Sequence, residues 1–195
     1  MSKISLIAIG SSTGGTEALA RVIPKLMPPI PPIVIVQHIP PKFSKSLADR
    51  LDRESLLTVK EGEHGELVLP NHVYIAPGGL HMELRRNREG GLQIRCFVAP
   101  PVHSCRPAVD VLFKSVAELV GAEALGVILT GIGHDGTEGL LEMKQKGSPT
   151  LGQDEATSVV YGMPKAAFNA GAVDMQIPLD SMALAIMNTV KKFNN

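Results

Sequence analysis

The chain has 195 residues, of which 44% are hydrophobic and 19% are charged, a composition typical of a globular protein with a sizeable core and not of a disordered chain. Its 19 basic and 19 acidic residues give a formal net charge of zero, so no broad electrostatic field would attract nucleic acid or an anionic membrane. No apolar run approaches the roughly 20 residues that span a bilayer, and we expect no membrane insertion. One domain over residues 1–195 is the simplest organisation.

The two cysteines, Cys96 and Cys105, belong to no CxxC pair. The sequence therefore offers neither a disulfide framework nor the spacing of zinc ligands. We expect a reducing, cytoplasmic location and a function that needs no metal or cofactor. The apolar stretch at the N-terminus stops at Gly10 without a small-residue cleavage site, so it predicts a strand and not a signal peptide.

Short apolar runs that are rich in Ile and Val, and bounded by Gly or Pro, predict strands in chain order at residues 4–9, 33–37, 73–76 and 126–130. Apolar residues at helical spacing predict helices at residues 16–25, 43–56, 108–120 and 136–146. Three of the strands are apolar nearly throughout, as is typical of parallel strands that are covered by helices on both faces.

The middle of the chain has a different pattern, with short strand-like pieces at residues 73–76, 81–86 and 92–97 that are separated by Gly-rich turns. This pattern predicts an antiparallel β-hairpin. The fold class that we expect is α/β: a doubly wound, mostly parallel sheet flanked by helices, with an appended antiparallel hairpin.

Polar residues follow the predicted strands directly, at the edge where open α/β sheets bind ligands. Ser12 follows the first strand in Gly10-Ser11-Ser12-Thr13-Gly14, which fits the G-x-S-x-G pattern of an exposed nucleophile on a tight strand-to-helix turn. His38 follows the second strand, and Asp135 follows the last. A serine needs a base, and the base needs an acceptor that fixes its ring. We therefore predict a Ser12, His38 and Asp135 triad.

The helix that begins near Gly14 points its positive end toward the same place. Backbone N–H groups of Thr13 and Gly14 are thus candidate donors to an oxyanion. The sequence predicts a serine hydrolase at this edge of the sheet.

A phosphate-binding loop is the main alternative, since Gly10 and Gly15 have the G-x-x-x-x-G spacing of a P-loop. However, Thr16 and Glu17 stand where that motif requires a lysine and a hydroxyl residue, and the Glu17 carboxylate would repel phosphate. A non-catalytic nucleotide- or phosphate-binding domain remains the second hypothesis.

Structural roles are the alternative for the two triad partners. His38 could cap its strand, and Asp135 could be the N-cap of the helix at residues 136–146, a role that is compatible with catalysis. His134 is the reserve candidate for the base because it also stands near a strand end. The remaining histidines do not: His64, His72, His81 and His103.

Several segments, in the same order along essentially the entire chain, resemble the CheB-type chemotaxis protein-glutamate methylesterases. They include Gly10-Ser11-Ser12-Thr13-Gly14-Gly15, Gln37-His38-Ile39-Pro40, Tyr74-Ile75-Ala76-Pro77-Gly78, His81-Met82, Arg106-Pro107, Val109-Asp110-Val111-Leu112-Phe113, Thr130-Gly131-Ile132-Gly133-His134-Asp135-Gly136 and Gly162-Met163-Pro164. This collinearity is more specific than any single motif.

The resemblance implies hydrolysis of γ-glutamyl methyl esters on methyl-accepting chemotaxis receptors, with release of methanol, and in some members deamidation of receptor glutamines. By motif match, Ser12 is the nucleophile, His38 the base and Asp135 the residue that orients the base. A serine esterase acting on another ester is a third hypothesis.

The resemblance also implies binding residues. The backbone around Thr13 and the position of Ile132 are associated with the oxyanion site, and Met163 is expected to line the cleft. Arg106 is a candidate for pairing with receptor carboxylates, although an arginine at a helix start is more often a solvated or structural charge.

Three positions near the predicted site depart from the commonest family pattern: Ser11 stands in place of alanine, and Ile39 and Ile132 stand in place of methionine. A second departure is the lack of an N-terminal receiver domain before the catalytic strand. The chain is then either a stand-alone enzyme or an excised domain. A stand-alone enzyme would be regulated by expression, by localisation or by a receiver or other regulatory protein in trans.

Overall fold

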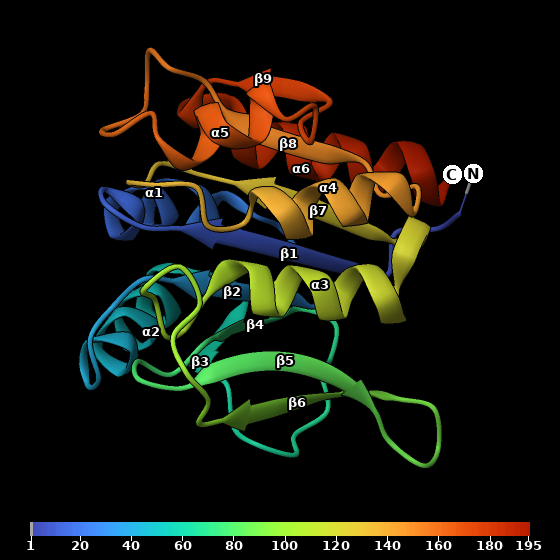
Figure 1. Cartoon of the computed structure of the whole chain (residues 1–195). Coiled ribbons are helices and arrows are strands. Elements are labelled where there is room, and N and C mark those ends of the chain that lie inside the picture. The colour runs from blue at the N-terminus through green and yellow to red at the C-terminus, as the bar shows by residue number, and fades with distance from the viewer. Residues whose placement is uncertain (1) are drawn as a thin grey trace.

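Seven parallel strands form the central sheet in the computed structural model, which describes residues 2–195 (Figure 1). Their order across the sheet is β3-β4-β2-β1-β7-β8-β9. The strands are β1 (Leu6–Ser11), β2 (Ile33–Gln37), β3 (Thr58–Glu61), β4 (His72–Ile75), β7 (Ala124–Ile128), β8 (Thr150–Gln153) and β9 (Met175–Ile177). The predicted α/β class with a mostly parallel sheet is thus confirmed.

Helices cover both faces of this sheet. One face carries α1 (Gly15–Val22), α2 (Phe43–Glu54) and α6 (Leu179–Asn194). The other carries α3 (Val109–Leu119), α4 (Thr137–Gln145) and α5 (Met163–Asn169), which lie in front of the sheet in Figure 1. Two short 3₁₀ turns, Ile23–Lys25 and Gly121–Glu123, extend α1 and α3.

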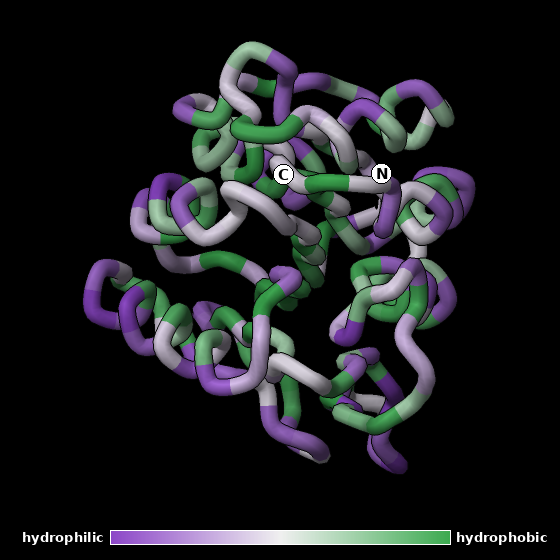
Figure 2. Tube along the Cα trace, turned by 60° about the vertical axis from the view of Figure 1, so that its left-hand side comes forward, coloured by the Kyte–Doolittle hydropathy of each residue, from purple (hydrophilic) through white to green (hydrophobic). Residues whose placement is uncertain are grey.

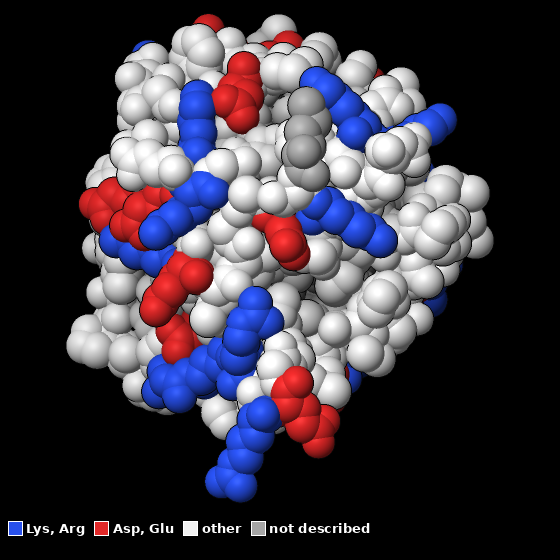
Figure 3. Space-filling model, turned by 90° about the vertical axis from the view of Figure 1, so that its right-hand side faces the viewer, with Lys and Arg blue, Asp and Glu red and all other residues white. Residues whose placement is uncertain are grey.

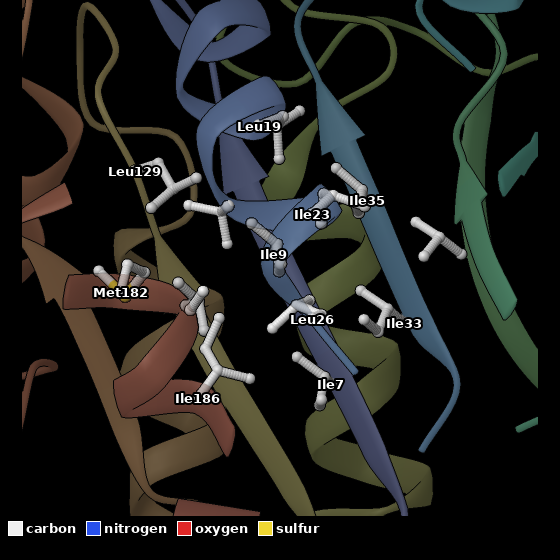
Figure 4. Close-up of a cluster of buried hydrophobic side chains, with 14 of the residues drawn as sticks. Ile7, Ile9, Leu19, Ile23, Leu26, Ile33, Ile35, Leu129, Met182 and Ile186 are labelled. Atoms are coloured by element: carbon white, nitrogen blue, oxygen red, sulfur yellow. The ribbon is translucent and has the colours of Figure 1, made fainter. Parts of the chain in front are cut away.

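The alternating side chains of β1 explain why the sheet needs both helical layers. Ile7 and Ile9 are fully buried in the cluster under α1 and α6, to which Leu19 and Ile186 also belong (Figure 4). Leu6 and the other intervening side chains are buried on the α3 side. Burying each large aliphatic side chain contributes about 1.5–3 kcal/mol. Figure 2 shows the resulting hydrophobic interior between polar outer segments.

The predicted hairpin is also confirmed, as β5 (His81–Arg86) paired antiparallel with β6 (Leu92–Phe97). These two strands form a second sheet and have no ladder to the seven-stranded one. The hairpin belongs to the same buried cluster as α3, and the backbone N–H of Leu84 donates to Ser115 Oγ at 3.0 Å. It is therefore attached to the fold through a helix.

The outer surface carries mixed charges. Figure 3 views the amino ends of the strands, where basic side chains lie among acidic ones. Within residues 2–195, no helix is long and apolar enough to cross a membrane.

The direction of winding changes between β1 and β7. From β1 the chain proceeds outward through β2 to β3 and β4, and then returns to β7 on the opposite side of β1. In open α/β sheets, ligands bind outside the carboxyl ends of the strands beside such a switch point. This switch point is where the predicted triad residues lie.

Candidate active site

The three predicted triad residues come from loops that follow neighbouring strands. Ser12 comes directly after β1 and His38 directly after β2, and the two strand ends are in register at Ser11 and Gln37. Asp135 lies between β7 and α4. The fold brings all three to the edge of the sheet that the sequence indicates.

His38 and Asp135 form a close pair, with Nε2 of the imidazole 2.6 Å from Oδ2 of the carboxylate. Asp135 is buried, and it also accepts the backbone N–H of Val109 at 2.7 Å and of Asp110 at 2.9 Å. Burial by itself would raise the pKa of the Asp135 carboxyl, but the hydrogen bonds from His38 and from these two amides outweigh burial and hold its pKa below the ordinary value. The carboxylate is thus ionised and can orient the ring.

The helix that Asp135 caps is α3, and the predicted capping of the following helix is wrong. The N-cap of α4 is Gly136, at φ 96°, without a side-chain cap. Instead, Asp110 in the first turn of α3 accepts the backbone N–H of Gly139 in α4 at 2.7 Å. The carboxylate before α4 therefore binds the start of α3, and the carboxylate in α3 binds the start of α4. We call this reciprocal arrangement the Asp135–Asp110 clasp.

The reserve base His134 lies against His103, with ring centroids 4.6 Å apart. His103 Nε2 is in turn 2.8 Å from Asp110 Oδ2. Within residues 2–195, His134 makes no hydrogen bond to Asp135. The geometry therefore favours His38 as the base.

Gln37, which sequence reasoning missed, holds the loop that carries Ser12. Its buried side-chain amide donates to the carbonyl of Ser12 at 2.8 Å and to the carbonyl of His38 at 3.1 Å. Ser11 Oγ donates to Gln37 Oε1 at 2.5 Å, which fixes the orientation of that amide. Because the Ser11 hydroxyl is buried and engaged in this bond, Ser12 is the serine available for chemistry. The signal in the sequence was a polar residue ending an otherwise apolar strand.

The predicted oxyanion donors lie around Ser12. Ser12 N–H donates to the carbonyl of Thr130 at 2.9 Å, whereas the N–H groups of Thr13, Gly14 and Ile132 donate to no protein acceptor in the described part of the chain. Thr130 Oγ1 donates to the carbonyl of Thr13 at 2.9 Å and fixes that peptide. These N–H groups are therefore candidates to bind a substrate oxygen.

Of the other predicted binding residues, Met163 and Arg106 contact other parts of the protein, whereas Ile132 faces solvent. Met163 is fully buried and packs against Gly131, where a Cβ atom would come within 2.7 Å of Ser12 Cβ. Arg106 Nη1 donates to the carbonyl of Ala99 at 2.9 Å. Ile132, by contrast, exposes 64% of its surface.

Cys105 is the neighbour of His38 that the sequence did not predict. Its Sγ lies 3.6 Å from His38 Nδ1, the ring nitrogen that faces away from Asp135. Within residues 2–195, no hydrogen bond joins Ser12 to His38. Burial, and then the charge of Asp135, raise the pKa of the Cys105 thiol. The thiol therefore keeps its proton and can donate it weakly toward the Nδ1 lone pair.

The arrangement suits acyl transfer. A carboxylate at Nε2 favours the tautomer with a proton on that nitrogen, which leaves the Nδ1 lone pair to accept a proton.

Two groups of side chains also have the composition of metal ligands: His38 with Cys105 and Asp135, and His103 with Asp110 and Glu138.

Acid should remove the stabilisation that Asp135 supplies. Because its folded-state pKa is lowered, its contribution is fully present above the ordinary aspartate pKa of about 3.9 and is lost as pH falls through the lower folded-state value. We expect the difference in free energy of unfolding between the native chain and Asp135→Asn to be constant above about pH 5 and to shrink below pH 4. Urea denaturation across this range measures it, and parallel losses in both proteins would contradict the assignment.

Comparisons with known proteins identify the family to which this fold belongs. The family model described as CheB methylesterase matches residues 7–186. A protein-glutamate methylesterase/protein-glutamine glutaminase of Photorhabdus laumondii is 55% identical over 174 residues, which cover 89% of this chain and 49% of the relative. One from Caulobacter vibrioides is 52% identical over 184 residues, or 94% of this chain and 53% of the relative. The chain thus spans about half the length of these curated relatives.

A solved structure shares the fold. The crystal structure of the Thermotoga maritima CheB methylesterase catalytic domain superposes with a TM-score of 0.93 at 41% sequence identity. The match covers 96% of this chain and 100% of the other.

Proposed function

The chain belongs to the CheB methylesterase family, and we propose that it hydrolyses γ-glutamyl methyl esters on methyl-accepting chemotaxis receptors and releases methanol. The observation that carries this proposal is the 2.6 Å pair of His38 and Asp135 at the sheet edge where Ser12 follows β1. The family supplies the class of ester, and the site supplies a base with an orienting carboxylate beside a serine.

In the proposed mechanism, Ser12 Oγ attacks the ester carbonyl while His38 Nδ1 takes its proton. The oxyanion binds the free N–H groups of Thr13 and Ile132. Collapse of the intermediate expels methoxide, which leaves as methanol with the proton from His38. Water, deprotonated by His38, then hydrolyses the acyl-enzyme to give the glutamate side chain and free Ser12.

The Cys105 thiol must move away from Nδ1 before Ser12 can use that nitrogen. Deamidation of glutamine follows the same path with ammonia as the leaving group, and we include it because the relatives' names carry both activities.

The surroundings of Ser12 suit a protein substrate. Ile132 is 64% exposed, and Val159, whose side chain lies beside Gly14, is 71% exposed. Prominent surface hollows lie elsewhere, such as the one lined by Pro149, Met175 and other residues of β8, β9 and α6. Ile132 and Val159 thus form an exposed apolar rim beside Ser12. Such a rim suits binding of a receptor helix better than binding of a small metabolite, which needs a concave pocket. The proposed setting is the cytoplasm, with regulation by a receiver domain in the same chain or in trans.

Nucleotide binding has less support. Glu17 projects from the first turn of α1 and pairs with Arg50 at 2.8 Å. This pairing, chiefly its hydrogen bond, lowers the pKa of the Glu17 carboxyl. A negative charge therefore stands where a P-loop has its hydroxyl residue, and Thr16 stands where a P-loop has its lysine.

Substrate choice tests the proposal. We expect the protein to release methanol from a methylated receptor fragment with a higher kcat/KM than from free γ-glutamyl methyl ester, because the exposed rim adds binding energy only for the protein substrate. Headspace quantification of methanol measures both rates, and the unmethylated fragment is the control. Equal kcat/KM values would favour an esterase that acts on other esters.

A further inference from the structure

The second nitrogen of the candidate base faces a sulfur atom, and together they resemble two ligands of a zinc ion. His38 Nδ1 and Cys105 Sγ are 3.6 Å apart. Zinc binds histidine nitrogen at about 2.0–2.1 Å and cysteine sulfur at about 2.3 Å in tetrahedral sites, so two such ligands lie about 3.6 Å from each other. The two atoms therefore already have the separation that zinc requires.

The surroundings of the pair resemble those of a metal-binding histidine. Such a histidine usually donates its other ring N–H to a carboxylate, which fixes the ring and increases its basicity. Here Asp135 Oδ2 has this role at 2.6 Å. Asp135 is not itself a free ligand, because its oxygens also accept the N–H groups of Val109 and Asp110. It is an orienting group, and two side chains remain to bind the ion.

Cys105 is held in place by its own turn. Val102 and Cys105 exchange two backbone hydrogen bonds, at 3.0 and 2.9 Å. The two residues between them, His103 and Ser104, have φ values of 50° and 62°, which non-glycine residues seldom adopt. The fold maintains an unfavourable turn that places this thiol beside the base.

We propose that Zn²⁺ binds to His38 Nδ1 and Cys105 Sγ, with water in the remaining positions, and thereby inhibits the enzyme. On binding, the Cys105 thiol releases its proton to solvent and becomes a thiolate, while neutral His38 donates its Nδ1 lone pair. That lone pair is the one that takes the Ser12 proton in the proposed function, on which the inhibitory part of this inference rests. The metal-bound enzyme cannot activate Ser12.

The binding test uses Co²⁺ as a spectroscopic substitute for Zn²⁺ and does not depend on activity. Titration of the native chain with Co²⁺ should produce a near-ultraviolet thiolate-to-cobalt charge-transfer band, which Zn²⁺ should abolish by displacement. The band should be absent in Cys105→Ala and strongly weakened in His38→Ala. Cys96→Ala is the matched control: it removes the other cysteine, whose pKa burial raises to about 11, and it should keep the band.

The inhibition test uses methyl ester hydrolysis by the same proteins. At a Zn²⁺ concentration about ten times its Kd, activity of the native chain should fall about tenfold, since only the free enzyme turns over. EDTA should restore it, which separates metal binding from thiol oxidation. Cys96→Ala should be inhibited equally, whereas Cys105→Ala should have the same activity with Zn²⁺ as it has without Zn²⁺, whatever its own basal rate.

The outcomes separate the two proposals. A charge-transfer band that persists in Cys105→Ala, or no band in the native chain, would overturn the metal site whatever the enzymatic activity. Equal inhibition of Cys105→Ala would place the inhibitory ion elsewhere. A band with the expected variant pattern in a protein without esterase activity would retain the metal site and overturn the proposed function.

Discussion

Replacing Ser12 by alanine is expected to lower methyl ester hydrolysis by at least about three orders of magnitude while the protein remains folded. The substitution removes the oxygen that attacks the ester and leaves the backbone bonds of the loop in place, including Ser12 N–H to Thr130 and Gln37 to the Ser12 carbonyl. Methanol release measures the activity, and circular dichroism with thermal unfolding measures the fold.

Ser11→Ala is the matched control for this prediction. Ser11 Oγ donates to Gln37 Oε1, so its removal loosens the amide that holds the loop without removing the nucleophile. The expected loss is modest, about tenfold or less, and corresponds to one lost hydrogen bond of about 0.5–1.5 kcal/mol. Retention of full activity by Ser12→Ala, or a larger loss in Ser11→Ala, would assign the nucleophile differently.

Asp135→Asn is expected to combine two large effects. The activity should fall by roughly four orders of magnitude, because an amide that donates toward the imidazole favours the wrong tautomer. The free energy of unfolding should fall by about 1–3 kcal/mol, since asparagine offers one acceptor oxygen where the carboxylate receives His38, Val109 and Asp110. Steady-state kinetics and urea denaturation measure the two effects separately.

The clasp provides a matched control within the same structure. Asp110→Asn weakens the bond to Gly139 N–H and the contact with His103, and it should destabilise the protein by a similar amount. Its effect on kcat should be far smaller, because Asp110 does not contact His38. Comparable losses of activity in both variants would mean that Asp135 acts through helix packing and not through the base.

The central strands were predictable because their burial is nearly complete. β1, β2 and β7 consist of buried residues throughout, so they stand out in the sequence as continuous apolar runs. β3 was missed because only Val59 is fully buried in it, and β9 because two of its three residues are exposed. Both are edge strands. One side of an edge strand faces solvent, so the pattern of apolar residues in its sequence is weak.

Two other missed elements had different causes. β8 is a buried strand of four residues that contains a glycine and two polar residues, so its composition does not indicate a strand. α6 buries Leu179, Met182, Ala183 and Ile186, and these residues have helical spacing in the sequence. Tertiary packing therefore determines β8, whereas the local hydrophobic pattern is enough to indicate α6.

The candidate site was predictable as far as strand ends determine it. His38 and Asp135 form a pair, and Ser12 lies at the same edge, because the loops after parallel strands of one sheet share that edge. The capping of α3 by Asp135 and the approach of Cys105 to His38 depend on where distant segments pack, which no local pattern reveals. The catalytic roles stay predictions that the variants above address. The organisation of residues 1–195 as one catalytic domain also stays a prediction.

The Asp135–Asp110 clasp has an evolutionary consequence. Active-site groups commonly lower the free energy of unfolding, so a gain in enzymatic activity is often accompanied by a loss of stability. Here the carboxylate that orients the base also caps a helix, and a substitution that impairs one role impairs the other. Purifying selection on turnover would therefore preserve thermal resilience as well. A descendant that lost catalysis would retain a reason to keep this aspartate, so its presence alone would be a poor marker of an active enzyme.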